Sequence, residues 1–199
     1  MKRIKEKKER ALGTKLFLKA DRCNSPKCVM IRRPFRPGVH GEKRHSVSPY
    51  GEQLKEKQKM QVSYGLSDRK LAALFGRYTK DEILKRLESR LDKTVFLAGF
   101  APSLSMARGV VSHGHIIVNK RKVTISSYLV KKGDVISIRA ESEPRKIFDD
   151  VREKWGKHNL PKWLKKEEKG ISVVSLEATS PDTAELHLDV SVVGEFYAR

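Results

Sequence analysis

The sequence contains few cysteines and no long apolar segment, and these shortages exclude two classes of protein. Cys23 and Cys28 are the only cysteines, too few for the disulfide framework of a small secreted domain, and they suit a reducing compartment. No stretch approaches the roughly 18 apolar residues of a membrane-spanning helix. The basic N-terminus MKRIKEKKER is not followed by the apolar region and cleavage site of a secretory signal. We therefore expect a cytoplasmic protein.

Acidic residues are also scarce. The 24 Asp and Glu residues stand against 43 Lys and Arg, so the formal net charge is +19 and the isoelectric point is about 10.0. Solubility requires much less charge than this, and a polyanionic partner such as nucleic acid is the simplest explanation. The 199 residues, of which 38% are hydrophobic, suffice for a modest core and one or two domains.

Signatures of catalysis are missing as well. The sequence contains no Gly-rich phosphate-binding loop, no recognisable pairing of Ser with His and no cluster of metal ligands. We expect a binding protein rather than an enzyme.

Turn residues and charge divide the first half of the chain. Residues 1 to about 50 are rich in Lys, Arg, Pro and Gly and have little apolar periodicity, which predicts an extended, irregular basic arm. Residues 50–64 lie between Pro49 and Gly65 and contain strong helix formers with charges of both signs. This pattern predicts a charged, exposed helix.

Capping residues mark the helices that follow. Ser67 precedes a short helix with apolar residues on one face. Thr79 and Glu82 have the spacing of a capping box before an amphipathic helix with a basic side. Ser103 caps a further helix after a tight turn.

β-Branched residues replace this pattern after Gly114. The segments HIIVNKRKVTI and DVISIRA predict short strands in a small hairpin-rich sheet, with a turn at Asn119 and Lys120. Residues 144–158 return to helical spacing and should lead back to the first domain, while the C-terminal EFYAR should dock on a core. The expected fold class is therefore α+β.

Cations gather in the arm and between Glu88 and Arg139, where two helices meet the hairpin. Phosphates require Lys and Arg at fixed positions, and a rigid platform of helices and a hairpin supplies the shape match for structured RNA. The candidate RNA-binding residues of the arm, the helices and the hairpin are Arg32, Arg33, Arg36, His40, Lys43, Arg44, Lys55, Lys59, Arg86, Arg90, Arg108, His113, His115, Asn119, Lys120, Arg121 and Lys122.

Several candidates have a structural alternative. Arg90 could pair with Asp92 or Glu88 instead of RNA, and these two interpretations have equal weight. His113 and His115 are expected to face RNA, although His115 could instead pack beside its apolar neighbours.

A charge run is often only a solvated face, which is a second alternative. Acidic residues balance the lysines between Gly51 and Lys59, which weakens the case for RNA binding by that helix. The arm segment RRPFRPGVHGEKRH contains only Glu42 against many cations, so it is the stronger candidate.

One stretch closely resembles the S4-type RNA-binding domain, a helix-helix-hairpin module. The resemblance lies in ESRLDKTVFLAGF, SMARGVVSHGHIIVNKRKV and SSYLVKKGDVISIR. The flanking segments resemble one family that contains this module, the bacterial-type small-subunit ribosomal protein S4 family. These segments are TKLFLKADRCNSPKC and RRPFRPGVHGEKR in the arm, YGEQLKEKQKMQVSYGLSDRKL in the helices and EFYAR at the C-terminus. The resemblance covers nearly the whole chain.

The resemblance implies a structural protein of the small ribosomal subunit. Members of the family bind a multi-helix junction of small-subunit rRNA early in assembly, beside the fifth small-subunit ribosomal protein and near the path by which mRNA enters. The module, residues 88–144, is expected to be inserted into a mainly helical domain formed by residues 1–87 and 145–199. The expected partners are rRNA, neighbouring ribosomal proteins and mRNA, with no membrane.

Two other functions use the same module. Pseudouridine synthases and some tRNA synthetases carry it beside a catalytic domain, but the residues outside the module are too few for one here. A free-standing RNA-binding quality-control factor of the heat-shock type would not need the long N-terminal arm. Both functions are alternatives to a ribosomal protein.

The expected metal content departs from that of the family. Many bacterial members bind zinc through two cysteine pairs, but Glu6 and Glu9 stand here where the first pair would fall. We therefore expect no cofactor and no zinc.

A zinc finger is the remaining metal hypothesis. Cys23 and Cys28 are the only candidate thiol ligands, and with His40 and His45 their spacing approximates that of a two-Cys, two-His finger. The prolines and glycine between residues 34 and 38 interrupt the helix that such a finger needs for its histidines. Two leftover cysteines are the better explanation.

Overall fold

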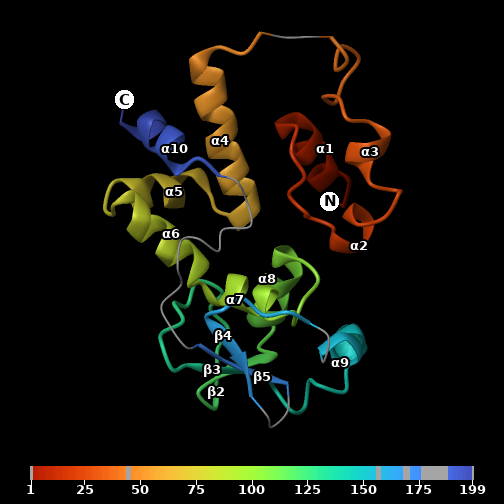
Figure 1. Cartoon of the computed structure of the whole chain (residues 1–199), viewed down its shortest axis with the longest axis vertical. Coiled ribbons are helices and arrows are strands. Elements are labelled where there is room, and N and C mark those ends of the chain that lie inside the picture. Colours follow the sequence, from red (N-terminus) through yellow and green to blue (C-terminus); the bar gives the residue numbers. More distant parts are fainter. Residues whose placement is uncertain (1, 44–45, 156–157, 168–170, 176–187, 199) are drawn as a thin grey trace. The chain divides into compact units, whose positions relative to one another are not determined.

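The computed structural model describes residues 2–43, 46–155, 158–167, 171–175 and 188–198 of the chain. The described residues form two compact units. The first contains those of Met1–Ile83 and Ala184–Arg199, and the second contains those of Leu84–Thr183 (Figure 1). No helix in the described part of the chain combines the length and apolarity needed to cross a membrane.

The first unit is helical. Its elements are α1 (Lys2–Leu12), α2 (Ala20–Cys23), α3 (Val29–Arg32), α4 (Pro49–Tyr64), α5 (Asp68–Phe75) and α10 (Val190–Tyr197), and α6 (Lys80–Glu88) continues into the second unit. Ser67 directly precedes α5, and the Thr79 backbone N–H donates to Glu82 Oε2 at 3.0 Å at the start of α6. Both predicted helix starts are confirmed.

The N-terminal arm is more regular than predicted. Residues 2–12 form α1, which is followed by Gly13 in the left-handed conformation (φ 70°), and the four-residue helices α2 and α3 come next. The predicted irregular structure is therefore wrong in these parts. The segment KRIKEKKERAL consists largely of strong helix formers, whose helix propensity does not require apolar periodicity.

Helix α4 packs against the C-terminal helix α10 (Figure 1). Lys57, Met60 and Tyr64 on this side of α4 are buried. The Lys57 Nζ atom lies 2.8 Å from Asp68 Oδ1 and 4.4 Å from the centroid of the Phe196 ring. The predicted helix between Pro49 and Gly65 is confirmed, but its predicted exposure is wrong along this side, because the stem of a lysine can be covered while its charge is paired. The predicted docking of the C-terminal residues is confirmed.

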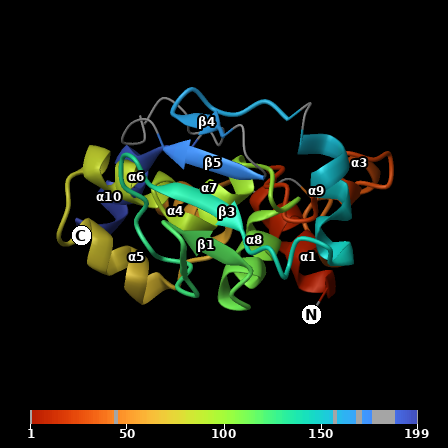
Figure 2. The same cartoon turned by 90° about the horizontal axis from the view of Figure 1, so that it is seen from below.

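The second unit combines helices with an antiparallel sheet. In the described part of the chain its elements are α7 (Leu91–Leu97), α8 (Leu104–Ser112), β1 (Ile116–Val118), β2 (Arg121–Lys122), β3 (Val135–Ile138), η1 (Lys146–Phe148), α9 (Asp149–Lys154), β4 (Leu164–Lys166) and β5 (Ser172–Ser175). The strand order is β2-β1-β3-β5-β4, and Figure 2 shows β1, β3, β5 and β4 side by side. The predicted α+β class and the predicted β1–β2 hairpin are confirmed.

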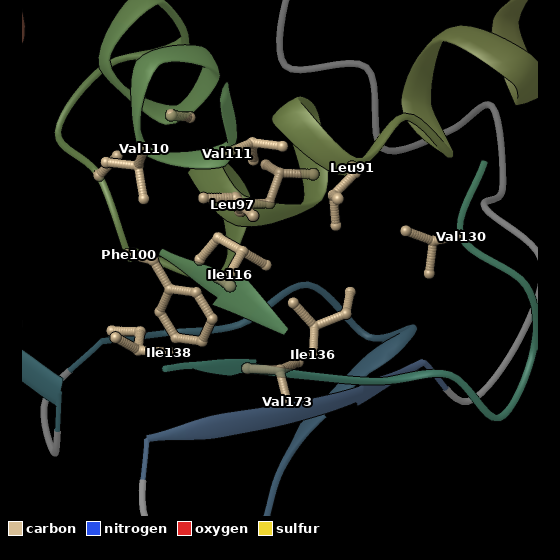
Figure 3. Packing of buried hydrophobic residues seen from close by; sticks show 14 of the residues in the cluster. Leu91, Leu97, Phe100, Val110, Val111, Ile116, Val130, Ile136, Ile138 and Val173 are labelled. Atoms are coloured by element: carbon tan, nitrogen blue, oxygen red, sulfur yellow. The ribbon is translucent and has the colours of Figure 1, made fainter. Parts of the chain in front are cut away.

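Helices α7 and α8 cover one face of this sheet. The antiparallel register places Ile116 opposite Ile138. It also places Ile136 opposite Val173, so the side chains of these pairs lie on the same face. Figure 3 shows these side chains packed with Phe100 between the strands and the helices. The apolar face of the sheet is thereby removed from water.

The sheet extends past the module boundary that was predicted at residue 144. Strand β5 pairs with β3, and β4 pairs with β5. Phe148 is buried in the same core, and the Trp155 ring centroid lies 5.3 Å from that of Phe100. The described residues of 145–183 therefore belong to the second unit. The prediction that they complete the first domain is wrong. Helical spacing identifies an amphipathic helix but not the domain against which its apolar face packs.

Val173 tests the position of β5. Val173→Ala should destabilise the protein by about 2 kcal/mol, because two buried methyl groups are removed and a cavity remains. Val174→Ala is the matched control: this neighbour is half-buried and its truncation should cost much less. Urea unfolding followed by circular dichroism measures both losses. Equal losses would contradict the packing of β5 against the helices.

Candidate nucleic-acid interface

The β1–β2 hairpin presents three consecutive cations. Asn119 and Lys120 form its turn with positive φ angles of 49° and 66°, as in the type I′ turn that matches the twist of paired strands. Lys120, Arg121 and Lys122 are all exposed. The hairpin therefore holds three positive charges close together on a short, hydrogen-bonded loop.

Asn119 fixes this turn through its side chain. Its Nδ2 atom donates to Asp134 Oδ1 at 2.8 Å, and the Val135 backbone N–H donates to Asn119 Oδ1 at 2.9 Å. The buried Asp134 carboxylate also accepts from the Lys131 backbone N–H at 2.8 Å. Asn119 was predicted as an RNA ligand, and the structure gives its amide a role in joining the turn to the start of β3.

Lys122 lies across the turn between α8 and β1. A Cβ atom on Gly114 would stand 2.1 Å from Lys122 Cε, and Gly114 has a positive φ of 72°. The glycine therefore provides both the left-handed conformation and the space for the lysine stem. His113 is exposed immediately before Gly114, so the fold brings the hairpin cation Lys122 close to His113.

His115 is only 8% exposed, so the prediction that it faces RNA is wrong. Its Nδ1 atom lies 2.9 Å from Ser142 Oγ, and its ring meets the Phe148 ring edge-on. The residues that follow β3 cover this histidine. The residues next to His115 in the sequence gave no sign of burial, because its partners Ser142 and Phe148 lie about 30 positions later.

Several positive charges surround His115. Burial lowers the pKa of His115, and the positive charges of Arg145, His113, Lys122 and Arg139 lower it further. The buried imidazole is therefore neutral at neutral pH. Arg139 and Arg145 were not among the predicted residues, because they follow the hairpin in sequence. The pairing of β3 with β1 brings Arg139 beside His115, where it also forms an ion pair with Glu141.

Arg90 and Arg108 share one carboxylate. Asp92 is 1% exposed and accepts from Arg90 Nε and Nη2 at 3.0 and 2.7 Å. It also accepts from Arg108 Nε and Nη2 at 3.0 and 2.6 Å. Of the two interpretations of Arg90, pairing with Asp92 is confirmed. Because the Arg108 side chain is 30% exposed, it reaches both the carboxylate and the solvent.

Backbone hydrogen bonds anchor this arginine pair. The Leu91 N–H donates to the Tyr128 carbonyl at 2.8 Å, and the Val130 N–H donates to the Ser89 carbonyl at 2.8 Å. The segment that carries Arg90 is therefore bound to the segment before β3. A carboxylate with two guanidinium groups on such a framework is pre-organised, since few rotations are open to the arginines.

In the first unit, Arg36, Lys43 and Lys55 line one hollow of about 260 Å³. Arg10 lines it as well: its Nε donates to the Phe35 carbonyl at 2.9 Å, and its guanidinium lies 5.1 Å from the centroid of the Phe35 ring. The described lining contains no acidic residue, so the hollow attracts anions. Arg10 was missed because it belongs to a segment of mixed charge, and only the folded arm brings it to the hollow.

The other candidates of the arm and helices lie outside this hollow. The exposed ones are Arg32, Arg33 and His40. Lys59 forms an ion pair with Glu56, and Arg86 is half-buried in α6. Arg44 lies outside the described residues. The structure thus groups three of the predicted cations of the first unit in the hollow and leaves the rest dispersed.

Comparison with known proteins finds similarity along almost the whole chain. Residues 89–136 match the S4 domain, and residues 1–95 match the Ribosomal protein S4/S9 N-terminal domain. The small ribosomal subunit protein uS4 of Caldicellulosiruptor bescii is 39% identical over 193 residues, which cover 94% of this chain and 93% of that protein. The protein of the same name from Thermus thermophilus is 39% identical over 194 residues with the same coverage. That from Gloeobacter violaceus is 37% identical over 196 residues, 96% of this chain and 94% of that protein.

Asp92→Ala tests the shared carboxylate. The variant should lose about 3 kcal/mol of stability, at the low end for breaking a buried ion pair because Arg108 is partly exposed. Asp81→Ala is the control, since Asp81 is exposed in the first turn of α6. Urea unfolding measures both variants, and a loss no larger than that of the control would mean that the two arginines do not depend on Asp92.

Proposed function

The chain belongs to the uS4 family of small ribosomal subunit proteins, and from this we propose that it binds small-subunit rRNA directly at a multi-helix junction. In this role it is a structural protein that joins the subunit early in assembly, and not an enzyme. Its neighbours then include the fifth small-subunit ribosomal protein near the path of entering mRNA, and its compartment is the cytoplasm.

The proposal is carried by the exposed cations of the hairpin. Lys120, Arg121 and Lys122 extend from a sheet with a buried core, so their positions are held by the fold rather than by a long loop. Cations at fixed positions suit double-stranded RNA, which proteins recognise mostly through its shape and its phosphates. Arg145 is exposed as well, and its positive charge lies close enough to His115 to lower the pKa of that histidine.

Binding in this proposal depends on the neutralisation of phosphates. Each Lys or Arg that meets a phosphate releases condensed counterions into solution, and this release favours binding most strongly at low salt. At a junction the phosphates of several RNA helices lie close together and repel one another. Cations with a fixed spacing offset that repulsion and thereby set the directions of the RNA helices.

Asp92 assists without touching RNA. By holding Arg108 in one arrangement, it reduces the conformational entropy that this partly exposed arginine would lose on binding, while Arg90 stays paired with the same carboxylate. Without Asp92 the two arginines would carry one more net positive charge, but Arg108 would bind with less directional preference.

The hollow of the first unit supplies a second contact in this proposal. Arg36, Lys43 and Lys55 converge there without an acidic neighbour in the described lining, which suits a backbone phosphate. His40 is exposed in the loop between Arg36 and Gly41, two residues that line the hollow. RNA contacts from both units would add to the number of phosphates that the protein neutralises.

The direct test is binding of the purified protein to the 5′ domain of small-subunit rRNA and to bulk tRNA, titrated across salt concentrations. Tight rRNA binding that survives a salt concentration able to remove tRNA is expected. Equal and steeply salt-dependent binding to both RNAs would mean that charge alone is being measured, and it would favour a free-standing RNA-binding factor.

The hairpin can be tested by a matched pair of double variants. Arg121→Ala with Lys122→Ala should weaken rRNA binding by about tenfold or more and lower the slope of log K against log salt by about 2, because two phosphate contacts are lost. Lys162→Ala with Lys165→Ala removes the same charge from exposed positions of the second unit outside the candidate interface. If both pairs weaken binding equally, the hairpin is not a specific contact.

Two lysines one turn apart on α4 test the hollow. Lys55→Ala should lower the salt slope of rRNA binding by about 1, as expected for one phosphate contact. Lys59→Ala is the control, because Lys59 lies outside the lining and pairs with Glu56. Circular dichroism verifies that both variants fold. An unchanged slope for Lys55→Ala would remove the hollow from the binding surface.

A further inference from the structure

The buried carboxylate of Glu9 is the central contact of the N-terminal arm. Glu9 is 2% exposed although it belongs to a helix of charged residues. Its Oε1 atom accepts from the backbone N–H groups of Leu16 and Leu18 at 3.2 and 3.1 Å, and the Cys23 Sγ atom lies 3.9 Å away. One carboxylate oxygen thus connects α1 with the loop that follows it and with α2.

The loop is held in an unusual conformation at this point. Phe17, between the two donating residues, has a positive φ of 51°, which is uncommon for a residue other than glycine. A left-handed residue turns the N–H groups on either side of it toward one point, and such a concave arrangement binds an anion. Glu9 supplies the anion from within the chain, so its hydrogen bonds and the conformation of Phe17 support each other.

Glu6 forms a second connection between α1 and the region of α2. Its Oε1 atom lies 2.8 Å from Lys19 Nζ and 2.9 Å from Arg22 Nη1. Glu6 and Glu9 are three residues apart, so they share one face of α1. Both acidic residues therefore bind groups of the segment 16–23.

The residues of the arm do not fit the zinc site, built from two cysteine pairs, of other bacterial members of the family. A structural zinc site requires about four donor atoms, and each cysteine that binds the zinc does so as a thiolate. Cys23 and Cys28 are the only thiols and both are buried, and the Glu9 oxygen that lies 3.9 Å from Cys23 Sγ already accepts two backbone N–H groups. The carboxylates are already bound to donors of the protein. Within the described ranges, no group of three or more His, Cys, Asp or Glu residues is placed to hold a metal ion.

We infer that the arm of this chain is closed by carboxylates in place of zinc, with Glu9 binding the 16–18 loop and Glu6 binding Lys19 and Arg22. Cys23 and Cys28 then act as small buried apolar residues and not as ligands. This inference concerns the folding of the arm and does not rest on the proposed RNA function, so it can be tested without RNA.

Hydrogen exchange of the full-length protein tests the role of Glu9. In Glu9→Ala, peptides that cover residues 13–19 should exchange about 10- to 100-fold faster, because the Leu16 and Leu18 N–H groups lose their acceptor. Glu9→Gln retains a neutral acceptor and should show a smaller increase. Glu42→Ala, at an exposed acidic residue of the arm, is the control and should leave exchange unchanged. Exchange of Glu9→Ala at the wild-type rate would overturn the inference.

Zinc itself is the second probe. After incubation with Zn²⁺ and desalting, elemental analysis of the wild-type protein should find far less than one zinc per chain, and a chelator should leave exchange at residues 13–19 unchanged. Glu6→Cys with Glu9→Cys restores two cysteine pairs and should gain close to one zinc per chain. A wild-type protein that binds one zinc, or whose arm opens with the chelator, would overturn the inference, and a double variant that binds none would show that Glu6 and Glu9 do not occupy ligand positions.

Discussion

A chain with a net charge of +19 must fold against the repulsion between its own cations, and its acidic side chains are few. Glu9, Asp92 and Asp134 are almost fully buried, and each accepts hydrogen bonds from several parts of the chain. A buried carboxylate without such partners would be unstable. These residues therefore fix the segments around them: the arm, the start of α7 with α8, and the turn of the hairpin.

The inward position of these carboxylates also determines the charge of the surface. At the hairpin, Asp134 is buried beneath the turn while Lys120, Arg121 and Lys122 are exposed. Near α7, Asp92 is covered while Arg108 remains partly in solvent. Acidic side chains exposed beside these cations would repel an approaching anion at close range. The arrangement that stabilises the fold is thus the same one that leaves cations available to an RNA phosphate.

Local features of the fold could be predicted because they depend on neighbouring residues. The helix starts at Ser67 and Thr79, and the hairpin turn at Asn119 and Lys120, depend on hydrogen bonds or φ angles within a few positions. Whether a side chain is buried or exposed depends on partners that are far away in sequence. Lys57 illustrates this, because its stem and charge are covered by residues of α10 more than a hundred positions later.

By itself the sequence determined the excess of positive charge, the α+β class, the hairpin and the family, since composition and short motifs carry these properties. Only the tertiary structure decided that residues 145–175, where described, belong to the second unit with β4 and β5 in its sheet, that His115 is buried and that Arg90 pairs with Asp92. The physical reason is the same in each case. Burial and pairing are fixed by which distant segments pack together, and that choice is made by the whole core rather than by any one segment.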